Sequence, residues 1–300
     1  MKVEVVDVRR SLADMGKTAG GRVAQALNAG LGSRAHGRFG ILYYHRLTWP
    51  TRGLRKPSLN VDPATFRAQL VGLRERGFLF STIGEILQAV ERGSSPPRRT
   101  VVLSFDDGYE GVYRYAWPVL KELDIRASLF VASAFIGSEE PFPFDPWGRA
   151  YASRAGTIDW MPLSWPQCTE LANSGEFEIG THTHQHADFR GRPADLVRDI
   201  RTSVRVIGER SGVTTSLFSF PYGDVGKGFA SAELAAAARE AGMLCGLTTA
   251  VDLVQPEADP FTWGRFEATG SDTAATLAAK LDGWYGWMEQ GRRAFRAVTG

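Results

Sequence analysis

The sequence has little cysteine, no long apolar run and almost no net charge. Its 300 residues include two cysteines, Cys168 and Cys245, too few for a disulfide framework or a cysteine-based metal cluster. No segment approaches the roughly 20 apolar residues of a membrane span, and the N-terminus lacks the apolar core of a secretion signal. The 35 basic and 33 acidic residues leave a charge of +2, which gives no reason to expect nucleic acid as a partner. We therefore expect a cytoplasmic globular protein without a membrane span, and no pattern points to a protein partner.

Short apolar runs alternate with amphipathic segments from residue 38 onward. The expected strands are 39–45, 78–82, 99–105, 126–133, 177–182, 215–223 and 244–249. The expected helices are 62–77, 83–93, 109–124, 165–175, 193–212 and 230–242. The strands are apolar throughout, which is typical of parallel strands covered on both faces. About seven β-then-α units favour an α/β fold of the distorted (β/α)7-type barrel class over an open sheet.

This pattern divides the chain into three regions. We expect residues 38–270 to form the barrel, residues 1–37 to be an N-terminal helical extension, and residues 271–300 to form a C-terminal helix that packs on the barrel. The apolar face of that last helix is expected to consist of Trp284, Tyr285, Trp287 and Met288. A long irregular stretch, 135–162, interrupts the barrel region, and loops of that length in a compact domain are usually functional.

Polar side chains follow several of the expected strands at the point where each strand ends. His45 ends the first strand, Asp106 and Asp107 follow the third, histidines at 182–186 follow the fifth, and a Pro-Tyr-Gly-Asp turn at 221–224 follows the sixth. In a parallel barrel the carboxyl ends of the strands meet at one face, where active sites lie. The sequence therefore predicts a single polar site at that face.

The residue types at these strand ends are suited to metal binding. The segment "GTHTHQH" places His182, His184 and His186 on one face if it stays extended, whereas a coiled segment brings only His182 and His186 together. Adjacent carboxylates diverge, so one of the Asp106–Asp107 pair can bind a metal while the other takes a proton. Two imidazoles and one carboxylate make a three-ligand site that leaves positions open for water and substrate.

Three motifs also resemble those of a known family. "SFDDGY", "HTHQH" and "FPYGD" are similar to the first three motifs of the polysaccharide deacetylases, the NodB-homology or carbohydrate esterase 4 family. The resemblance implies the NodB-homology fold and one divalent metal ion held by Asp107, His182 and His186. Zinc is the first expectation, with cobalt, nickel or iron as alternatives. It also implies Asp106 as general base, Pro221 and the backbone N–H of Tyr222 beside the oxyanion, and His184 as a neighbour rather than a ligand.

The implied reaction is removal of N-acetyl groups from an N-acetylated amino-sugar polysaccharide or oligosaccharide, with release of acetate. Two features depart from the family pattern. Ser219 stands where many members have an arginine, and no histidine follows His186, so the C-terminal Leu-x-His motif is absent. "ILYYHRL" resembles an element of the circularly permuted poly-N-acetylglucosamine deacetylase branch, which implies protonated His45 as the catalytic acid rather than a structural histidine. Arg265 is expected to replace the missing arginine and to keep Asp106 ionised. The alternative is that Arg265 forms an ordinary surface salt bridge.

The aromatic residues of the 135–162 stretch have two interpretations. Phe142, Phe144, Trp147 and Trp160 either stack on sugar rings, with Trp147 as a substrate contact, or pin the loop to the barrel. Two other functions also fit the fold: hydrolysis of a cyclic or other small amide, and non-catalytic carbohydrate binding. The second is disfavoured because pure binding does not need a base, an acid and a metal in one place.

Overall fold

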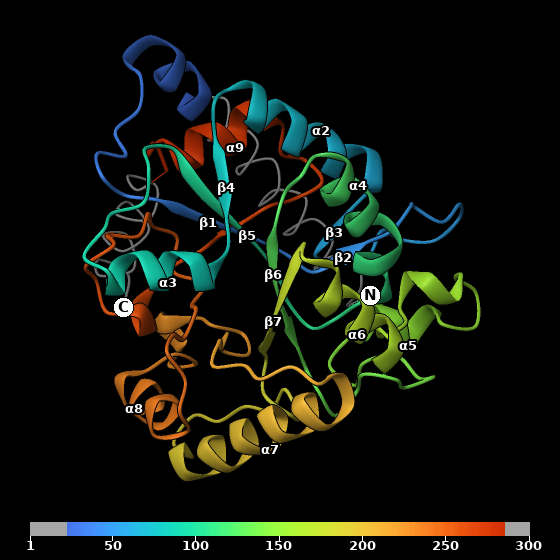
Figure 1. Ribbon diagram of the computed structural model, residues 1–300. Helices are drawn as coiled ribbons and strands as arrows, with labels where there is room; N and C mark the ends of the chain where they lie inside the picture. The colour runs from blue at the N-terminus through green and yellow to red at the C-terminus, as the bar shows by residue number, and fades with distance from the viewer. Residues whose placement is uncertain (1–22, 286–300) are drawn as a thin grey trace, which may run out of the picture.

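The computed structural model describes residues 23–285 as an α/β fold built on a parallel sheet (Figure 1). The strands of this six-stranded sheet are β1 (Gly40–Tyr44), β4 (Leu79–Ser81), β5 (Thr100–Phe105), β6 (Ala127–Val131), β7 (Phe177–Thr181) and β8 (Phe266–Glu267). Their order is β7-β6-β5-β1-β8, with β4 paired to the start of β5, and every pairing is parallel. The predicted α/β class and parallel sheet are therefore confirmed.

The segment between β7 and β8 is less regular than expected. The strands predicted at 215–223 and 244–249 are reduced to single parallel bridges, Thr181 to Phe218 and Ser219 to Leu247. A backbone hydrogen bond of 2.8 Å from Thr248 to Trp263 continues the path toward β8. Most apolar residues of these segments are buried, with Tyr222 and Leu244 exposed, but the prediction of full strands was wrong. The turn at Tyr222 and Gly223 has positive φ angles, which ends extended pairing.

Besides the helical residues 23–31, eight α-helices have both ends among the described residues. They are α2 (Pro63–Glu75), α3 (Ile83–Glu91), α4 (Trp117–Glu122), α5 (Pro146–Tyr151), α6 (Trp165–Ser174), α7 (Pro193–Ser211), α8 (Ala232–Glu240) and α9 (Ala274–Leu281). Asp62, Thr82 and Ser164 each cap a helix by accepting a backbone N–H. The helix predicted at 109–124 instead begins with a π-helical turn, Val112–Ala116, just before Pro118. Two short strands, β2 (Arg46–Leu47) and β3 (Asn60–Val61), pair outside the main sheet and were not predicted.

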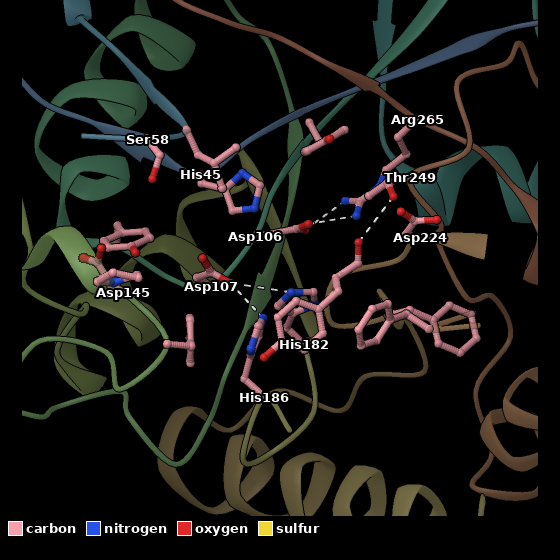
Figure 2. A pocket seen from close by; sticks show the side chains of 18 of the residues that line it. His45, Ser58, Asp106, Asp107, Asp145, His182, His186, Asp224, Thr249 and Arg265 are labelled. Atoms are coloured by element: carbon pink, nitrogen blue, oxygen red, sulfur yellow. Dashed lines mark hydrogen bonds and ion pairs between the residues drawn. The ribbon is translucent and has the colours of Figure 1, made fainter. Parts of the chain in front are cut away.

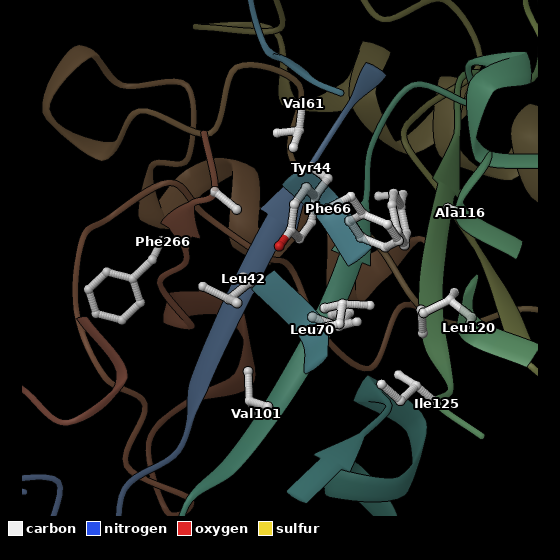
Figure 3. Packing of buried hydrophobic residues seen from close by; sticks show 14 of the residues in the cluster. Leu42, Tyr44, Val61, Phe66, Leu70, Val101, Ala116, Leu120, Ile125 and Phe266 are labelled. Carbon is white, nitrogen blue, oxygen red and sulfur yellow. The ribbon is translucent and has the colours of Figure 1, made fainter. Parts of the chain in front are cut away.

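Alternate residues of the strands belong to two different apolar clusters. The first cluster includes Ile41, Val102, Phe130, Leu247 and Trp263, together with Ile83 and Ile86 of α3. The second includes Leu42, Tyr44, Leu103 and Leu129, which pack against Phe66 and Leu70 of α2 and their neighbours (Figure 3). Side chains alternate along a strand, so residues two and four positions after Ile41 and Val102 lie on the same face of the sheet as the first cluster. Tyr43, His45, Ser104 and Asp106 therefore project to the same side of the sheet.

The C-terminal part of the described chain packs against α2 and against the segment near Gly32. α9 runs beside α2 (Figure 1), close enough that a Cβ on Gly72 would lie 2.4 Å from the Cβ of Ala274. The indole of Trp284 donates to the carbonyl oxygen of Gly32 at 2.9 Å, and this tryptophan lies beyond the end of α9. Trp287 and Met288 lie outside the described residues, as do residues 1–22. Among residues 23–285, no helix combines the length and apolarity needed to span a bilayer.

Candidate active site

A cavity of about 400 Å³ opens at the carboxyl ends of the strands (Figure 2). Residues that follow β1, β5 and β7 supply part of its polar lining. The predicted site residues that line the cavity are His45, Asp106, Asp107, His182, His186, Tyr222 and Arg265. Side chains separated by as many as 220 positions in the sequence thus meet in one cavity, because parallel strands bring their carboxyl ends to one face.

Asp107, His182 and His186 form a compact group in the cavity. Oδ1 of Asp107 lies 3.5 Å from Nε2 of each histidine, and one ligand atom from each residue lies within 4.8 Å of the others. All three side chains are buried. Asp107 has a φ of 72°, which turns its carboxylate away from the direction that strand alternation gives Asp106. The two adjacent carboxylates therefore serve different neighbours.

The group fits a divalent metal ion. Nδ1 of His182 lies 2.9 Å from the carbonyl oxygen of Ser219, a contact that holds a proton on Nδ1 and leaves Nε2 free as a ligand atom. Oδ1 of Asp107 is buried without a hydrogen-bond partner among the described residues. Burial lowers the pKa of both histidines, so their contacts with Asp107 involve neutral rings rather than imidazolium ions. A buried, unpartnered carboxylate oxygen facing two neutral imidazoles is a metal-binding arrangement.

His186 is oriented mainly by its surroundings rather than by a hydrogen bond from its ring. The ring of Phe144 stacks on the imidazole with centroids 3.8 Å apart and planes 20° apart. The backbone N–H of His186 donates to Oγ1 of Thr183 at 3.0 Å. His184 points elsewhere, with Nδ1 2.9 Å from the hydroxyl of Ser133, and it does not line the cavity.

Asp106 is held by a two-pronged contact with Arg265. The guanidinium donates from Nη1 to Oδ1 at 2.9 Å and from Nη2 to Oδ2 at 2.8 Å, and both side chains are buried. Arg265 is itself fixed by Thr248 and Ser104, whose oxygens accept from its Nε and Nη1. Burial alone would raise the pKa of Asp106, but the charge and hydrogen bonds of Arg265 outweigh it and hold the pKa below its usual range. Asp106 is therefore an ionised carboxylate.

His45 lines the cavity from the end of β1 and points toward Asp106 and Asp107 (Figure 2). Burial lowers its pKa to about 4, although the charge of Asp106 opposes this shift. The resting imidazole is therefore neutral at neutral pH. The protonated form expected from the sequence is therefore not the resting form at neutral pH.

The remaining predicted site residues lie at the rim of the cavity or outside its lining. Tyr222 is 47% exposed, has a φ of 64° and lines the cavity, whereas Pro221 lines a small neighbouring cavity. Trp147 is buried away from the cavity lining, where its indole donates to the carbonyl oxygen of Arg55 at 2.7 Å. In this position Trp147 pins the 135–162 stretch, and Phe144 and Asp145 of the same stretch line the cavity instead.

Arg46, a charged residue near the site, was missed in the sequence, as was Lys227 in the cavity lining. Arg46 is buried, forms an ion pair with Asp145, and lies over the ring of Tyr109 at 4.5 Å. The pair ties the 135–162 stretch to β2, beside His45. The available signal was the position of Arg46, which follows an apolar strand and a histidine. Its partner Asp145 is 99 positions away, and no local sequence pattern identifies this pairing.

The family model for polysaccharide deacetylase matches residues 93–245, about half of the chain. The chain belongs to the polysaccharide deacetylase family. Metal dependence is general in this family, and the matched region contains all three residues of the metal-binding group. It also contains Asp106 and Tyr222, whereas His45 and Arg265 lie outside it.

Curated relatives of this deacetylase-family chain include two enzymes with the same printed name. The poly-beta-1,6-N-acetyl-D-glucosamine N-deacetylase of Staphylococcus epidermidis is 25% identical over 234 residues, 75% of this chain and 73% of the relative. The enzyme of that name from Staphylococcus aureus is 24% identical over 173 residues, 55% of this chain and 54% of the relative. The chain thus matches about half the length of the Staphylococcus aureus protein.

Solved structures share the fold of this deacetylase-family chain. A de-N-acetylase from Aggregatibacter actinomycetemcomitans superposes with a TM-score of 0.67 at 21% identity, covering 81% of this chain and 100% of the other. IcaB from Ammonifex degensii superposes with a TM-score of 0.65 at 24% identity, covering 82% and 97%. At these identities the likeness establishes the fold.

Proposed function

We propose that this protein is a metal-dependent hydrolase that removes N-acetyl groups from an N-acetylated amino-sugar polysaccharide or oligosaccharide and releases acetate. The observation that carries the proposal is an ionised Asp106, held by Arg265, beside a three-ligand group in one cavity. The names of the staphylococcal relatives support poly-β-1,6-linked N-acetylglucosamine as the kind of glycan. Family membership supports the reaction class.

Asp107, His182 and His186 would hold one divalent ion, and zinc suits their two nitrogen atoms and one carboxylate oxygen best. Cobalt, nickel and iron accept the same ligands. When bound, the ion supplies a Lewis acid for the acetyl carbonyl and lowers the pKa of a water molecule toward about 7. The protein residues then have to place the acetyl group, move protons and hold the developing negative charge.

Asp106 is the proposed base that takes a proton from the attacking water. Its contact with Arg265 keeps the carboxylate ionised and fixes both of its oxygens, so that it meets water in one orientation. The backbone N–H of Tyr222 is proposed to donate to the carbonyl oxygen as negative charge develops on it. The positive φ of Tyr222 is an unusual backbone conformation for a non-glycine residue, and such conformations cluster at functional sites.

His45 is the proposed donor of the proton that the departing amine requires. Because its resting imidazole is neutral, it acts as an acid only after it has received a proton in the same turnover. We propose Asp106 as the source, because this carboxylate gains a proton from the attacking water. After Asp106 has passed that proton to His45, its negative charge favours the imidazolium form of His45. One proton thus travels from water to the amine nitrogen.

We further propose that the segments at 215–223 and 244–249 complete a distorted (β/α)7-type barrel of the NodB-homology type between β7 and β8. The single bridges from Thr181 to Phe218 and from Ser219 to Leu247 support this closure. The site would then lie at the mouth of a barrel whose interior is filled by the Ile41–Trp263 cluster.

The first test measures metal content and acetate release on the same samples of wild type and Asp106→Asn. N-acetylglucosamine oligomers are the substrate. We expect about one metal ion per chain in both proteins, and acetate from the wild type alone. Bound metal without acetate from the wild type would move the substrate toward small amides. No metal in either protein after reconstitution would contradict the proposal and favour a carbohydrate-binding role.

A further inference from the structure

The loop that carries His182 and His186 has a strained backbone. Thr183 has a φ of 67° and His186 a φ of 48°, both in the left-handed region. This region is unfavourable for a β-branched residue such as threonine, and such backbone persists only where surrounding contacts fix it. The spacing between the two histidine rings therefore depends on what holds residues 183–186 in place.

Helix α7 supplies contacts at the centre of this loop. The carboxylate of Asp199 accepts hydrogen bonds from the backbone N–H groups of His184 and Gln185, the latter at 3.2 Å. These two N–H groups lie between His182 and His186 in the chain. A carboxylate that accepts two successive backbone N–H groups fixes the path of the loop more firmly than a neutral acceptor would.

A second residue on the same face of α7 reinforces this attachment. Ser203, one helical turn after Asp199, is fully buried and accepts from the hydroxyls of Thr181 at 2.7 Å and Ser133 at 2.9 Å. Thr181 ends β7, directly before His182, and Ser133 follows β6. The buried face of α7 is thus attached to the loop at 184–185 and to the strand end that precedes it.

We propose that Asp199 is a positioning residue that holds the 182–186 loop so that His182 and His186 can bind one metal ion. The inference rests on the proposed metal site and adds a residue from a helix that contributes nothing to the cavity lining. Removal of the carboxylate leaves the backbone N–H groups of His184 and Gln185 without this acceptor. The left-handed backbone then relaxes, and the two Nε2 atoms lose their spacing.

The test is zinc affinity, measured by titration against a competing chelator, in Asp199→Ala, Asp199→Asn and Asp195→Ala. Asp195 is a matched control because it lies in the first turn of α7 and pairs with Arg192 and Arg198 rather than with the loop. We expect Asp199→Ala to weaken zinc binding by about 10–100-fold, the usual effect of losing a residue that orients a metal ligand. Asp199→Asn keeps an acceptor and should fall between wild type and alanine, and Asp195→Ala should match wild type.

Hydrogen exchange of the metal-free proteins gives a second readout. Peptides covering 182–186 should exchange faster in Asp199→Ala, while peptides from α3 should exchange as in wild type. If Asp199→Ala does not fold, Asp199→Asn carries the test, because its weaker bonds should still speed exchange at 182–186.

Wild-type zinc affinity and wild-type exchange in a folded Asp199 variant would overturn the inference and leave the proposed function standing. Failure of the wild-type protein to bind zinc would instead overturn the proposed function, and the positioning role with it.

Discussion

Asp106 and Asp107 are neighbours in the chain with opposite electrostatic surroundings. Burial raises the pKa of Asp107, and the negative charge of Asp106 raises it further. The pKa of Asp106 is lowered because Arg265 outweighs its burial. Two carboxyl groups whose environments separate their pKa values are suited to different roles, one as a proton acceptor and one as a ligand that requires a cation.

Replacing Arg265 by Gln should change the pH dependence of the reaction. Without the guanidinium the pKa of Asp106 rises, so the base becomes protonated at a higher pH and the acidic limb of kcat/KM moves upward. In the wild type, the ionised Asp106 stabilises the fold above the usual carboxyl pKa, and this stabilisation is lost as the pH falls through the lowered pKa. The variant should lack this contribution to the free energy of unfolding. A pH–rate profile and urea unfolding at several pH values measure both effects. An unshifted acidic limb would contradict the role given to Arg265.

His45→Ala separates an acid catalyst from a structural histidine. An amide nitrogen needs a proton to leave, so deacetylation of N-acetylglucosamine oligomers should slow by about 10²–10⁴-fold. An aryl acetate has a good leaving group and should be hydrolysed nearly as fast as by wild type. Rates on both substrates measure the difference, with the exposed His36→Ala as control. Equal losses on the amide and the ester would indicate that His45 is not the acid.

The grouping of the three candidate metal ligands was predictable from sequence because each lies at the end of an apolar strand. Asp107, His182 and His186 follow β5 and β7, and parallel strands bring their ends together. Arg46 and Asp199 were not predictable in the same way. Their partners are Asp145 and the backbone of His184, and pairings of this kind depend on tertiary structure rather than on any local pattern.

At the scale of elements, regular patterns predicted regular structure. The apolar run before Asp106 became β5, and Pro63 after the capping Asp62 began α2. The 109–124 segment has the composition of one helix, yet it contains a π-helical turn ahead of Pro118. The 215–223 segment is apolar like its neighbours but pairs only at single bridges. Apolar composition predicts burial and does not by itself predict backbone pairing.

Gly111→Ala tests a close contact between two elements. A Cβ at Gly111 would lie 2.0 Å from the carbonyl oxygen of Leu47, a backbone atom of β2 that cannot move aside as a flexible side chain would. We expect a loss of about 1–3 kcal/mol in the free energy of unfolding, measured in urea. Gly30→Ala is the control, since a Cβ there would have no neighbour within 4 Å. Equal stability of the two variants would contradict this contact.

At the scale of the whole molecule, a bound ion should stabilise the fold. The three ligands come from two strand ends, so an ion that binds the folded chain more tightly than the unfolded chain raises the unfolding temperature. At zinc concentrations about 100 times the dissociation constant the gain is about 2.7 kcal/mol. Thermal unfolding with zinc and with a chelator measures it, and Asp107→Ala should show no difference between the two conditions.

The apolar cluster below the cavity has a consequence for the order in which products leave. Ile41, Val102 and Leu247 are fully buried on the side of the sheet from which the candidate site residues project, whereas Tyr222 in the cavity lining is 47% exposed. Under the proposed function, a glycan that approaches from the side of the exposed Tyr222 would place its acetyl group deeper than its sugar ring. Acetate then lies behind the deacetylated sugar, so the glycan must shift before acetate can depart. Under the proposed function, release of acetate therefore depends on movement of the glycan between successive units.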